Sequence, residues 1–369
     1  MPAAATLETA IASAIGAGRG AQVAIEQVQR GDIDYDAFLA HRSVHRIRGI
    51  ARLDGEPVEW SLVEKVTEGH DFASAYLADN ARRELAAYTS GVLGRLAPRV
   101  RAPRLHGWRL GADGRITLWL EDIPSPPRPL AADALLRAAR DLGGLAGAWV
   151  GRVPDAEWIF DGWIERHGQP GATDEGLAVL RRRHPAVVAR LGGRLDEAER
   201  LLRAQPRLRR VLESLPQTLC HHDAVGANVF PAPDGTVLID WESVGSGAVG
   251  ADLASLLFAS VRRGDASVRT VQQVMDAAVA AYADACAGVV SAGEVRQGLD
   301  AAIALRWKLA VDVAVTLERG EPARRGSAPA ESSEQALDEL VALVDVLLDA
   351  ARRALDAPGV SRRRPRVAE

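Results

Sequence analysis

The sequence predicts an α+β protein of two lobes, with a small antiparallel-sheet lobe followed by a larger, mainly helical lobe. Three observations support this prediction. Alternating apolar and polar residues before position 123 indicate strands. A proline-rich segment follows at 124–129, and beyond it Ala, Leu and Arg recur at helical spacing. We therefore expect an N-terminal lobe over 1–123, a C-terminal lobe over 124–356 and a basic tail over 357–369.

The N-terminal lobe is expected to contain two helices among its strands. Asp54-Gly55 separates two strand-like runs, and this dipeptide is a strong signal for a hairpin. The expected helices cover 6–17 and 79–96, and the expected strands cover 21–29, 44–53, 58–66, 104–108 and 116–120.

The C-terminal lobe is expected to be helical except around one short segment. Two short strands, over 218–220 and 237–239, enclose a loop that is rich in polar residues. Loops positioned by short strands often carry reactive side chains. The expected helices cover 131–150, 177–204, 251–259, 271–287, 293–316 and 334–355, with a loop over 319–333.

Composition restricts the class of protein. The chain has 369 residues, 47% hydrophobic and 25% charged, with a net charge of −4. This charge gives no indication of a nucleic-acid partner. No signal peptide or stretch of about 20 apolar residues is evident, which argues against a membrane partner. Cys220 and Cys286 are the only cysteines, so we expect a cytoplasmic protein without disulfides.

The polar loop has the spacing of a phosphoryl-transfer site. His221, Asp223 and Asn228 form the pattern H-x-D-x-x-x-x-N, and Asp240 ends the next apolar run. An aspartate can accept the proton of an attacking hydroxyl, so Asp223 is the candidate base. Asn228 and Asp240 offer the oxygen ligands that Mg²⁺ prefers. We assign His221 an orienting role.

Lys65 is the candidate contact for nucleotide phosphates. Lys65 and Lys308 are the only lysines, and Asn80 and Asn228 are the only asparagines. A lysine at the end of an apolar strand needs a partner when it is buried. The phosphates of ATP would provide one, and Glu84 in the next expected helix would pair with the same lysine.

Two further segments are candidates for nucleotide binding. Backbone groups of Glu121 and Ile123, at the end of a strand before the proline-rich segment, can hydrogen-bond an adenine edge. Resemblance to the aminoglycoside phosphotransferase family implies that the segment 38–43, before a strand, forms a phosphate-covering loop, but this segment has no glycine. Its backbone therefore approaches phosphates less freely, and Ser43 or Arg42 is the candidate contact instead.

Together these motifs resemble the aminoglycoside phosphotransferase family, which includes choline-kinase-like enzymes. The resemblance covers about residues 21–317 and implies a two-lobed, protein-kinase-like fold, ATP as donor and Mg²⁺ as cofactor. It also implies that Asp252 supports the catalytic loop. The matching residues are Lys65, Glu84, Leu120 to Asp122, His221, Asp223, Asn228, Ile239 to Glu242, and Gly250 to Ala254.

The sequence leaves the acceptor open. The first hypothesis is a small-molecule hydroxyl acceptor, similar to an aminoglycoside or another antibiotic. Trp158, Trp163, Glu242 and Trp307 are candidates to line its site, although tryptophans at these positions also fit an ordinary core. One alternative is a kinase for Ser or Thr in peptides during natural-product maturation. Another is a pseudokinase that serves as a binding subunit, which the glycine-free loop would explain.

Overall fold

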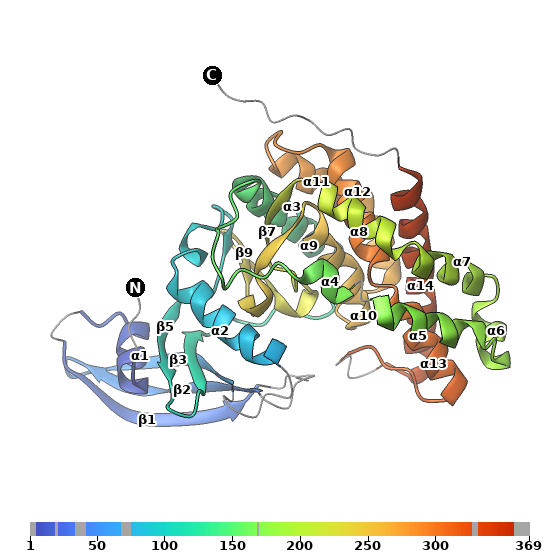
Figure 1. Cartoon of the computed structure of the whole chain (residues 1–369). Coiled ribbons are helices and arrows are strands. Elements are labelled where there is room, and N and C mark those ends of the chain that lie inside the picture. Colours follow the sequence, from blue (N-terminus) through green and yellow to red (C-terminus); the bar gives the residue numbers. More distant parts are fainter. Residues whose placement is uncertain are drawn as a thin grey trace, which may run out of the picture. The chain divides into compact units, whose positions relative to one another are not determined.

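The computed structural model describes residues 5–18, 21–33, 42–67, 75–167, 170–326 and 331–357. Its contacts divide the chain into two units, which we describe separately (Figure 1). The N-terminal unit comprises Met1–Leu96, Arg101–Pro126 and Val237–Val244, and the helical unit comprises Ala97–Val100, Pro127–Thr236 and Gly245–Glu369. The lobe boundary at 123/124 stays a prediction, and residues 358–369 of the expected tail lie outside the described residues.

The N-terminal unit contains a five-stranded sheet with the order β1-β2-β3-β6-β5, in which all neighbours are antiparallel. Asp54 and Gly55 join β2 to β3 with φ values of 53° and 94°, the positive pair that a type I′ hairpin turn requires. The expected strands and hairpin are therefore confirmed. The strands are β1 (Val23–Asp32), β2 (Arg42–Leu53), β3 (Glu56–Thr67), β5 (Leu105–Leu110) and β6 (Ile116–Glu121).

A helix covers one face of this sheet. Thr6 begins α1 (Leu7–Ala14) with a capping box, in which its side chain accepts from the Thr9 amide. This arrangement satisfies amide groups that the first helical turn leaves without partners. The apolar face of α1 packs on the sheet in a core of Ala10, Ile11, Ile47, Ala51, Trp60, Leu62 and Trp119.

The second helix of this unit, α2 (Ala75–Thr89), is shorter than predicted. It ends seven residues before the expected limit, close to Gly91, which has a φ of +79°. A left-handed glycine commonly terminates a helix. The short 3₁₀ turns η1 (Leu93–Arg95) and η3 (Trp241–Ser243) also belong to this unit.

The helical unit is built on a long helix pair, α3 (Ala132–Trp149) and α11 (Val268–Ala285), which pack against each other. Two strands, β7 (Gln217–Cys220) and β10 (Gly245–Ala248), pair antiparallel beside the polar loop that contains residues 221–228. The other helices are α4 (Trp163–His167), α5 (Pro170–Arg181), α6 (Pro185–Leu191), α7 (Arg194–Arg203), α8 (Gln205–Ser214), α9 (Ala251–Ala254), α10 (Ser260–Arg262), α12 (Ala292–Ala304), α13 (Lys308–Arg319) and α14 (Ser333–Asp356).

Short elements complete the chain around the loop. The turn η2 (Gly226–Asn228) lies within it, and the π-helical turn η4 (Ser255–Ala259) continues α9. The chain passes between the two units within β4 (Val100–Arg101) and β9 (Gly235–Leu238), and β8 (Val229–Ala232) precedes β9. In the described part of the chain, no helix combines the length and hydrophobicity of a membrane span.

Two expected helices are divided in the structure. The helix expected over 177–204 is three helices, because Pro185 starts α6 and Gly192 ends it with a φ of +51°. Proline is tolerated in the first turn of a helix but not in its interior. The helix expected over 293–316 is divided at Arg306 and Trp307, whose side chains bond to Ser255 and to the His167 carbonyl. Of the expected loop over 319–333, residues 327–330 lie outside the described residues.

Candidate active site

Lys65 is the centre of a buried charged cluster in the N-terminal unit. Its Nζ lies 2.6 Å from Glu84 Oε2 and 2.5 Å from Asp240 Oδ1. The side chains of Lys65 and Glu84 are only 9% and 2% exposed. A buried ammonium group is stable only with such partners. The structure thus brings together three predicted residues that are up to 175 positions apart in the sequence.

The backbone at Asp240 adopts an uncommon conformation. Its φ is +64°, a left-handed value that few non-glycine residues adopt without an energetic cost. The fully buried Trp241 fixes the turn, because its indole N–H donates to the Leu238 carbonyl at 2.7 Å. This tight turn presents the Asp240 carboxylate to Lys65.

Helix α2 holds the residues after Asp240 through two side chains that sequence reasoning missed. Asn80 Nδ2 donates to Glu242 Oε1 at 3.5 Å, and Arg83 Nη1 donates to the Glu242 carbonyl at 2.8 Å. Arg83 also donates to Asn80 Oδ1 at 2.7 Å. The same helix therefore positions Glu84 and the segment that carries Asp240.

The cluster offers oxygen ligands suited to a divalent cation. Glu84, Asp240 and Glu242 each present a carboxylate oxygen, and these oxygens lie within 4.8 Å of one another. Burial raises the pKa of Tyr88 well above its usual range, and the carboxylates of Glu84 and Asp240 raise it further. The local field is thus negative, and the donors are of the hard type that Mg²⁺ prefers.

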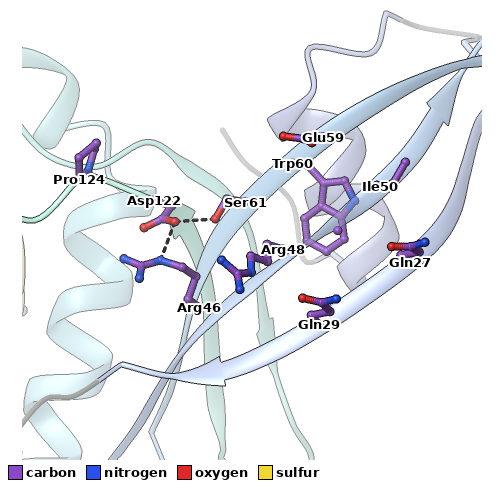
Figure 2. Close-up of a pocket in the computed structure, with 11 residues that line it drawn as sticks. Gln27, Gln29, Arg46, Arg48, Ile50, Glu59, Trp60, Ser61, Asp122 and Pro124 are labelled. Carbon is purple, nitrogen blue, oxygen red and sulfur yellow. Dashed lines mark hydrogen bonds and ion pairs between the residues drawn. The ribbon is translucent and has the colours of Figure 1, made fainter.

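A cavity of about 710 Å³ opens on the sheet of the N-terminal unit (Figure 2). Arg46, Arg48 and Ser61, which line it, share a sheet face with Lys65 because alternate residues of a strand point the same way. Asp122 lies at its edge, where its Oδ2 accepts from Arg46 Nε at 2.8 Å and from Ser61 Oγ at 2.5 Å. Two buried atoms of its lining, Asp122 Oδ1 and Trp60 Nε1, have no hydrogen-bond partner among the described residues. The lining residues are Gln27, Gln29, Arg46, Arg48, Gly49, Ile50, Glu59, Trp60, Ser61, Asp122 and Pro124.

The expected adenine-binding strand end lies next to this cavity. The side chain of Glu121 accepts from Arg101 at 2.6 and 3.0 Å, and its amide donates to the Arg104 carbonyl. The Glu121 amide is therefore already bonded within the unit. Adenine binding by Glu121 and Ile123 stays a prediction.

The expected phosphate-covering loop is only partly described. Residues 38–41 lie outside the described residues, and Ser43 is part of β2. Ser43 pairs with Val66, whereas Val44 pairs with Lys65. Since neighbouring residues of a strand point to opposite faces, Val44 shares the Lys65 face and Ser43 does not. A contact between Ser43 and phosphate stays a prediction.

In the helical unit, Asp223 and Asn228 are joined by hydrogen bonds within the polar loop. Asn228 Nδ2 donates to Asp223 Oδ2 at 3.0 Å and to its carbonyl at 2.9 Å. This use of the amide nitrogen reserves the Asn228 amide oxygen for another ligand. Arg263 Nη1 lies 3.3 Å from the same Asp223 oxygen, and the Asp223 side chain is 35% exposed.

The loop is held by its backbone. Asp252 is buried and accepts from the amides of His221 and His222, each at 2.8 Å. The Asp223 amide donates to His221 Nδ1 at 3.3 Å. Carboxylates that bind two backbone amides fix a turn strongly. Asp252 thus binds the backbone of this loop, and the orienting role of His221 stays a prediction.

Three further residues support the distal end of the loop and were not predicted. Arg128 donates to the carbonyls of Gly226, Ala227 and Val229. Ser260 Oγ accepts from the Gly226 amide at 2.7 Å, and Asp265 Oδ2 accepts from the Ala227 amide at 2.9 Å. None of them belongs to a recognisable motif, because each comes from an element distant in the sequence.

A comparison with protein-family models shows the family to which the chain belongs. Residues 61–287, more than half of the chain, match the model of the phosphotransferase enzyme family. The chain belongs to this family. The resemblance and the enzyme class expected from the sequence are therefore confirmed. No curated protein matches the sequence.

Solved structures confirm the fold of this phosphotransferase. An aminoglycoside phosphotransferase from Alicyclobacillus acidocaldarius superposes with a TM-score of 0.51 and 14% identity, covering 96% of this chain and 98% of that one. A choline kinase from Cryptosporidium parvum gives 0.50 and 11%, covering 89% and 90%. A Plasmodium vivax ethanolamine kinase gives 0.50 and 10%, covering 89% and 83%. At these identities the likeness shows the fold alone, and it confirms the expected two-lobed kinase-like class.

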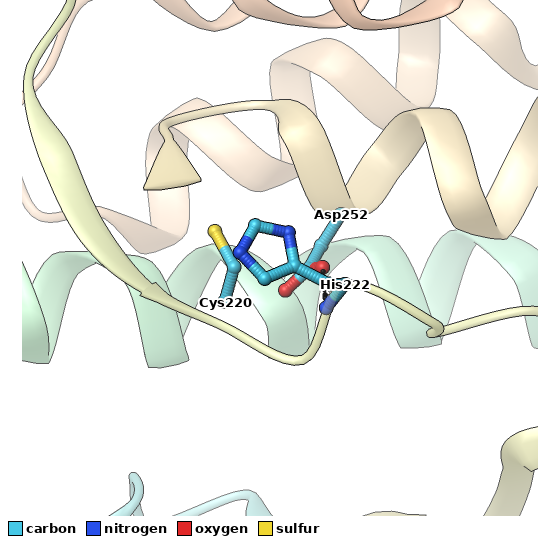
Figure 3. Close-up of side chains that lie close together, drawn as sticks. All are labelled: Cys220, His222 and Asp252. Carbon is cyan, nitrogen blue, oxygen red and sulfur yellow. Dashed lines mark hydrogen bonds between the residues drawn. The ribbon is translucent and has the colours of Figure 1, made fainter. Parts of the chain in front are cut away.

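His222 of the phosphotransferase, next to Asp223 in the sequence, is a buried residue and is only 5% exposed. Its ring stacks on Trp163 with centroids 5.5 Å apart, and Nε2 lies 2.9 Å from the Ser246 carbonyl. Figure 3 shows it beside Cys220 and Asp252. Because Asp252 already binds two amides and burial raises the pKa of the Cys220 thiol, this group is structural.

The tryptophans considered for the acceptor are mostly core residues of the phosphotransferase. Trp163 and Trp307 are 4% and 3% exposed, and the Trp307 indole donates to the His167 carbonyl at 3.1 Å. Trp158 is partly exposed. Glu242 belongs to the N-terminal unit, where it contacts Asn80. The alternative that these residues serve packing thus fits Trp163 and Trp307.

Proposed function

We propose that the protein is an ATP-dependent phosphotransferase that moves the γ-phosphoryl group to a hydroxyl of a small-molecule acceptor. The observation that carries this proposal is the Asp223–Asn228 pair on a loop fixed by Asp252. Family membership supports the reaction type. The Lys65–Glu84 ion pair at 2.6 Å supports the nucleotide, because active kinases require this pair.

In the proposed reaction, Asp223 accepts the proton of the acceptor hydroxyl. The hydroxyl oxygen forms a bond to the γ-phosphorus, the bond from that phosphorus to the bridging β-γ oxygen breaks, and ADP leaves. Asn228 donates a hydrogen bond to the Asp223 carboxylate, and the positive charge of Arg263 lies beside it. Lys65 would exchange one carboxylate partner for phosphate oxygens.

The proposed nucleotide site uses the cavity beside Asp122. A purine base would provide a partner for the unsatisfied Asp122 Oδ1. We assign the Mg²⁺ ligands to Asp240 and to the amide oxygen of Asn228. When bound, Mg²⁺ would neutralise charge on the phosphates. Lys65, Glu84, Glu121, Ile123 and Ser43 complete the proposed nucleotide contacts.

An acceptor screen tests the proposal. Mg–ATP consumption would be measured with aminoglycosides, other antibiotics, sugars, amino alcohols and Ser/Thr peptides. On the best acceptor, Asp223→Asn should lose about 10²- to 10⁴-fold in kcat. Asp234→Asn, the same change on an exposed turn, should leave kcat unchanged. Full turnover by Asp223→Asn would refute the assignment of the base, and turnover of peptides alone would favour the peptide-kinase hypothesis.

A further inference from the structure

Arg306 is a cation near the catalytic loop that the proposed reaction does not use. It lies between α12 and α13 and is partly buried. Its Nη2 donates to Ser255 Oγ at 2.8 Å, and that hydroxyl donates to the His222 carbonyl at 3.0 Å, one residue before Asp223. The guanidinium is therefore tied to the backbone that carries the base.

The guanidinium group is held in a fixed place by contacts other than a direct ion pair, although the carboxylates of Asp223 and Asp252 lie near enough to raise its pKa. Its Cζ lies 5.4 Å from the centroid of the Trp163 ring, a distance at which cation and ring attract each other. Among the described residues, no carboxylate pairs with Arg306, and its buried Nε has no hydrogen-bond partner. Burial of an unpaired guanidinium is costly, so its retention here suggests that a ligand completes the site.

Nearby acids are already engaged. Asp252 binds two backbone amides, and Asp223 binds Asn228 and Arg263. Asp312 pairs with both Arg262 and Lys308.

Arg306 keeps its positive charge in this place. Burial lowers the pKa of Arg306 to about 10, while the Asp223 carboxylate acts against this shift. With that pKa, Arg306 stays protonated at neutral pH. A charged guanidinium that has no direct ion pair among the described residues is therefore available to an anionic ligand.

We infer that the acceptor of the proposed phosphoryl transfer carries an oxyanion, a carboxylate or a phosphate monoester, which binds Arg306 while its hydroxyl faces Asp223. The inference rests on the proposed function. A planar guanidinium suits both oxyanions, since it donates two parallel hydrogen bonds. The same charge disfavours polycationic acceptors such as aminoglycosides, because like charges in a partly buried site repel.

A matched set of six-carbon acceptors tests this inference. Gluconate carries a carboxylate, sorbitol 6-phosphate a phosphate, sorbitol no charge and glucamine a positive charge. The kcat/KM of each would be measured by ADP release. We expect at least one anionic compound to exceed glucamine by about tenfold or more, and whichever anion is favoured identifies the group. A preference for glucamine would overturn the inference.

Variants assign the preference to Arg306. In Arg306→Gln, the KM of the favoured anion should rise about tenfold, while the KM of sorbitol should change by less than about threefold. Lys308→Gln removes one positive charge two positions away, on a side chain that is 69% exposed. This control variant should leave the KM of the anion and the KM of sorbitol unchanged. An equal loss of kcat for every acceptor would instead place Arg306 at the transferring phosphoryl group and overturn the inference. If Arg306→Gln fails to fold, Arg306→Lys is tested in its place and should retain part of the preference for the anion. If Arg306→Lys shows no preference for the anion over glucamine, the inference is overturned.

Calorimetry separates failure of this inference from failure of the proposed function. The four compounds would be titrated into the protein with Mg–AMP-PNP bound. Binding of an anion that depends on Arg306, without any transfer, would support the inference and refute the phosphotransferase proposal for these acceptors. Detectable transfer to sorbitol or glucamine without any binding of gluconate or sorbitol 6-phosphate would keep the proposed function and overturn the inference. Absence of both anion binding and transfer would overturn the inference as well.

Discussion

At the scale of single residues, lysine and asparagine each occur only twice, and three of these four residues bond to carboxylates of the candidate site. Lys65 and Asn228 were identified because each also belongs to a recognisable motif. Asn80, the other asparagine of the chain, is 1% exposed and bonds to Glu242 and Arg83. Its rarity alone was a signal that could have identified it. Its partners were not predictable, because Glu242 is 162 positions away.

Asn80 provides a prediction about stability. Asn80→Ala leaves the polar groups of Arg83 and Glu242 short of a partner in a buried place, which should cost about 1–3 kcal/mol of unfolding free energy. Asp79→Ala changes the preceding, exposed residue and should alter the free energy by less than about 0.5 kcal/mol. Urea unfolding of both variants measures the difference, and equal values would show that the Asn80 contacts are not stabilising.

At the scale of elements, periodicity predicted most strands and long helices, whereas breaks inside helical runs were missed. The break before α6 has a visible cause in Pro185, and Gly192-Gly193 marks its other end. The break between α12 and α13 has no proline or glycine to mark it in the sequence. It coincides with tertiary contacts of Arg306 and Trp307, which local sequence does not reveal. Short elements such as α4 and β10 were also missed, since their few residues carry no periodic pattern.

The contact between α3 and α11 gives a prediction with an internal control. A Cβ at Gly143 would collide with the backbone of Tyr282, whereas a Cβ at Gly144 would have no neighbour within 4 Å. Gly143→Ala should therefore destabilise the protein by about 1–3 kcal/mol through overpacking. Gly144→Ala should be neutral or stabilise by up to about 1 kcal/mol through helix propensity. Thermal unfolding that showed equal effects would contradict the described packing of the two helices.

At the scale of the whole molecule, sequence reasoning predicted the class of fold because motif and periodicity agreed. The two-lobed kinase-like fold and the family were both expected and are confirmed. The path of the chain was harder to predict, since Val237–Val244 belongs to the N-terminal unit although the sequence on either side of it belongs to the helical one. Such a return depends on long-range packing, which local patterns do not encode. It is nevertheless what brings Asp240 to Lys65.

The pH dependence of global stability provides a prediction for the whole chain. Burial lowers the pKa of His167 to about 3, and the charge of Arg306 contributes to this shift. Above a pH of about 6.5, the usual pKa of histidine in an unfolded chain, the His167 imidazole is neutral in both the folded and the unfolded protein. Below it, only the unfolded state binds the proton until about pH 3, so acid destabilises the folded protein.

Replacing His167 by glutamine isolates the contribution of this histidine to the pH dependence of stability. Between pH 6.5 and pH 4, the wild type should lose about 1 kcal/mol of unfolding free energy per pH unit more than His167→Gln. Denaturant unfolding across this range measures both slopes. Identical slopes for the two proteins would show that His167 takes up its proton equally well in the folded state.

Nucleotide binding tests the central claim most directly, and the chain supplies its own control because it has only two lysines. AMP-PNP would be titrated calorimetrically, with and without Mg²⁺, into the wild type, Lys65→Met and Lys308→Met. We predict saturable, Mg²⁺-dependent binding to the wild type and to Lys308→Met, and affinity at least about tenfold weaker for Lys65→Met. No binding to the wild type at millimolar Mg–AMP-PNP would contradict the account and favour a pseudokinase.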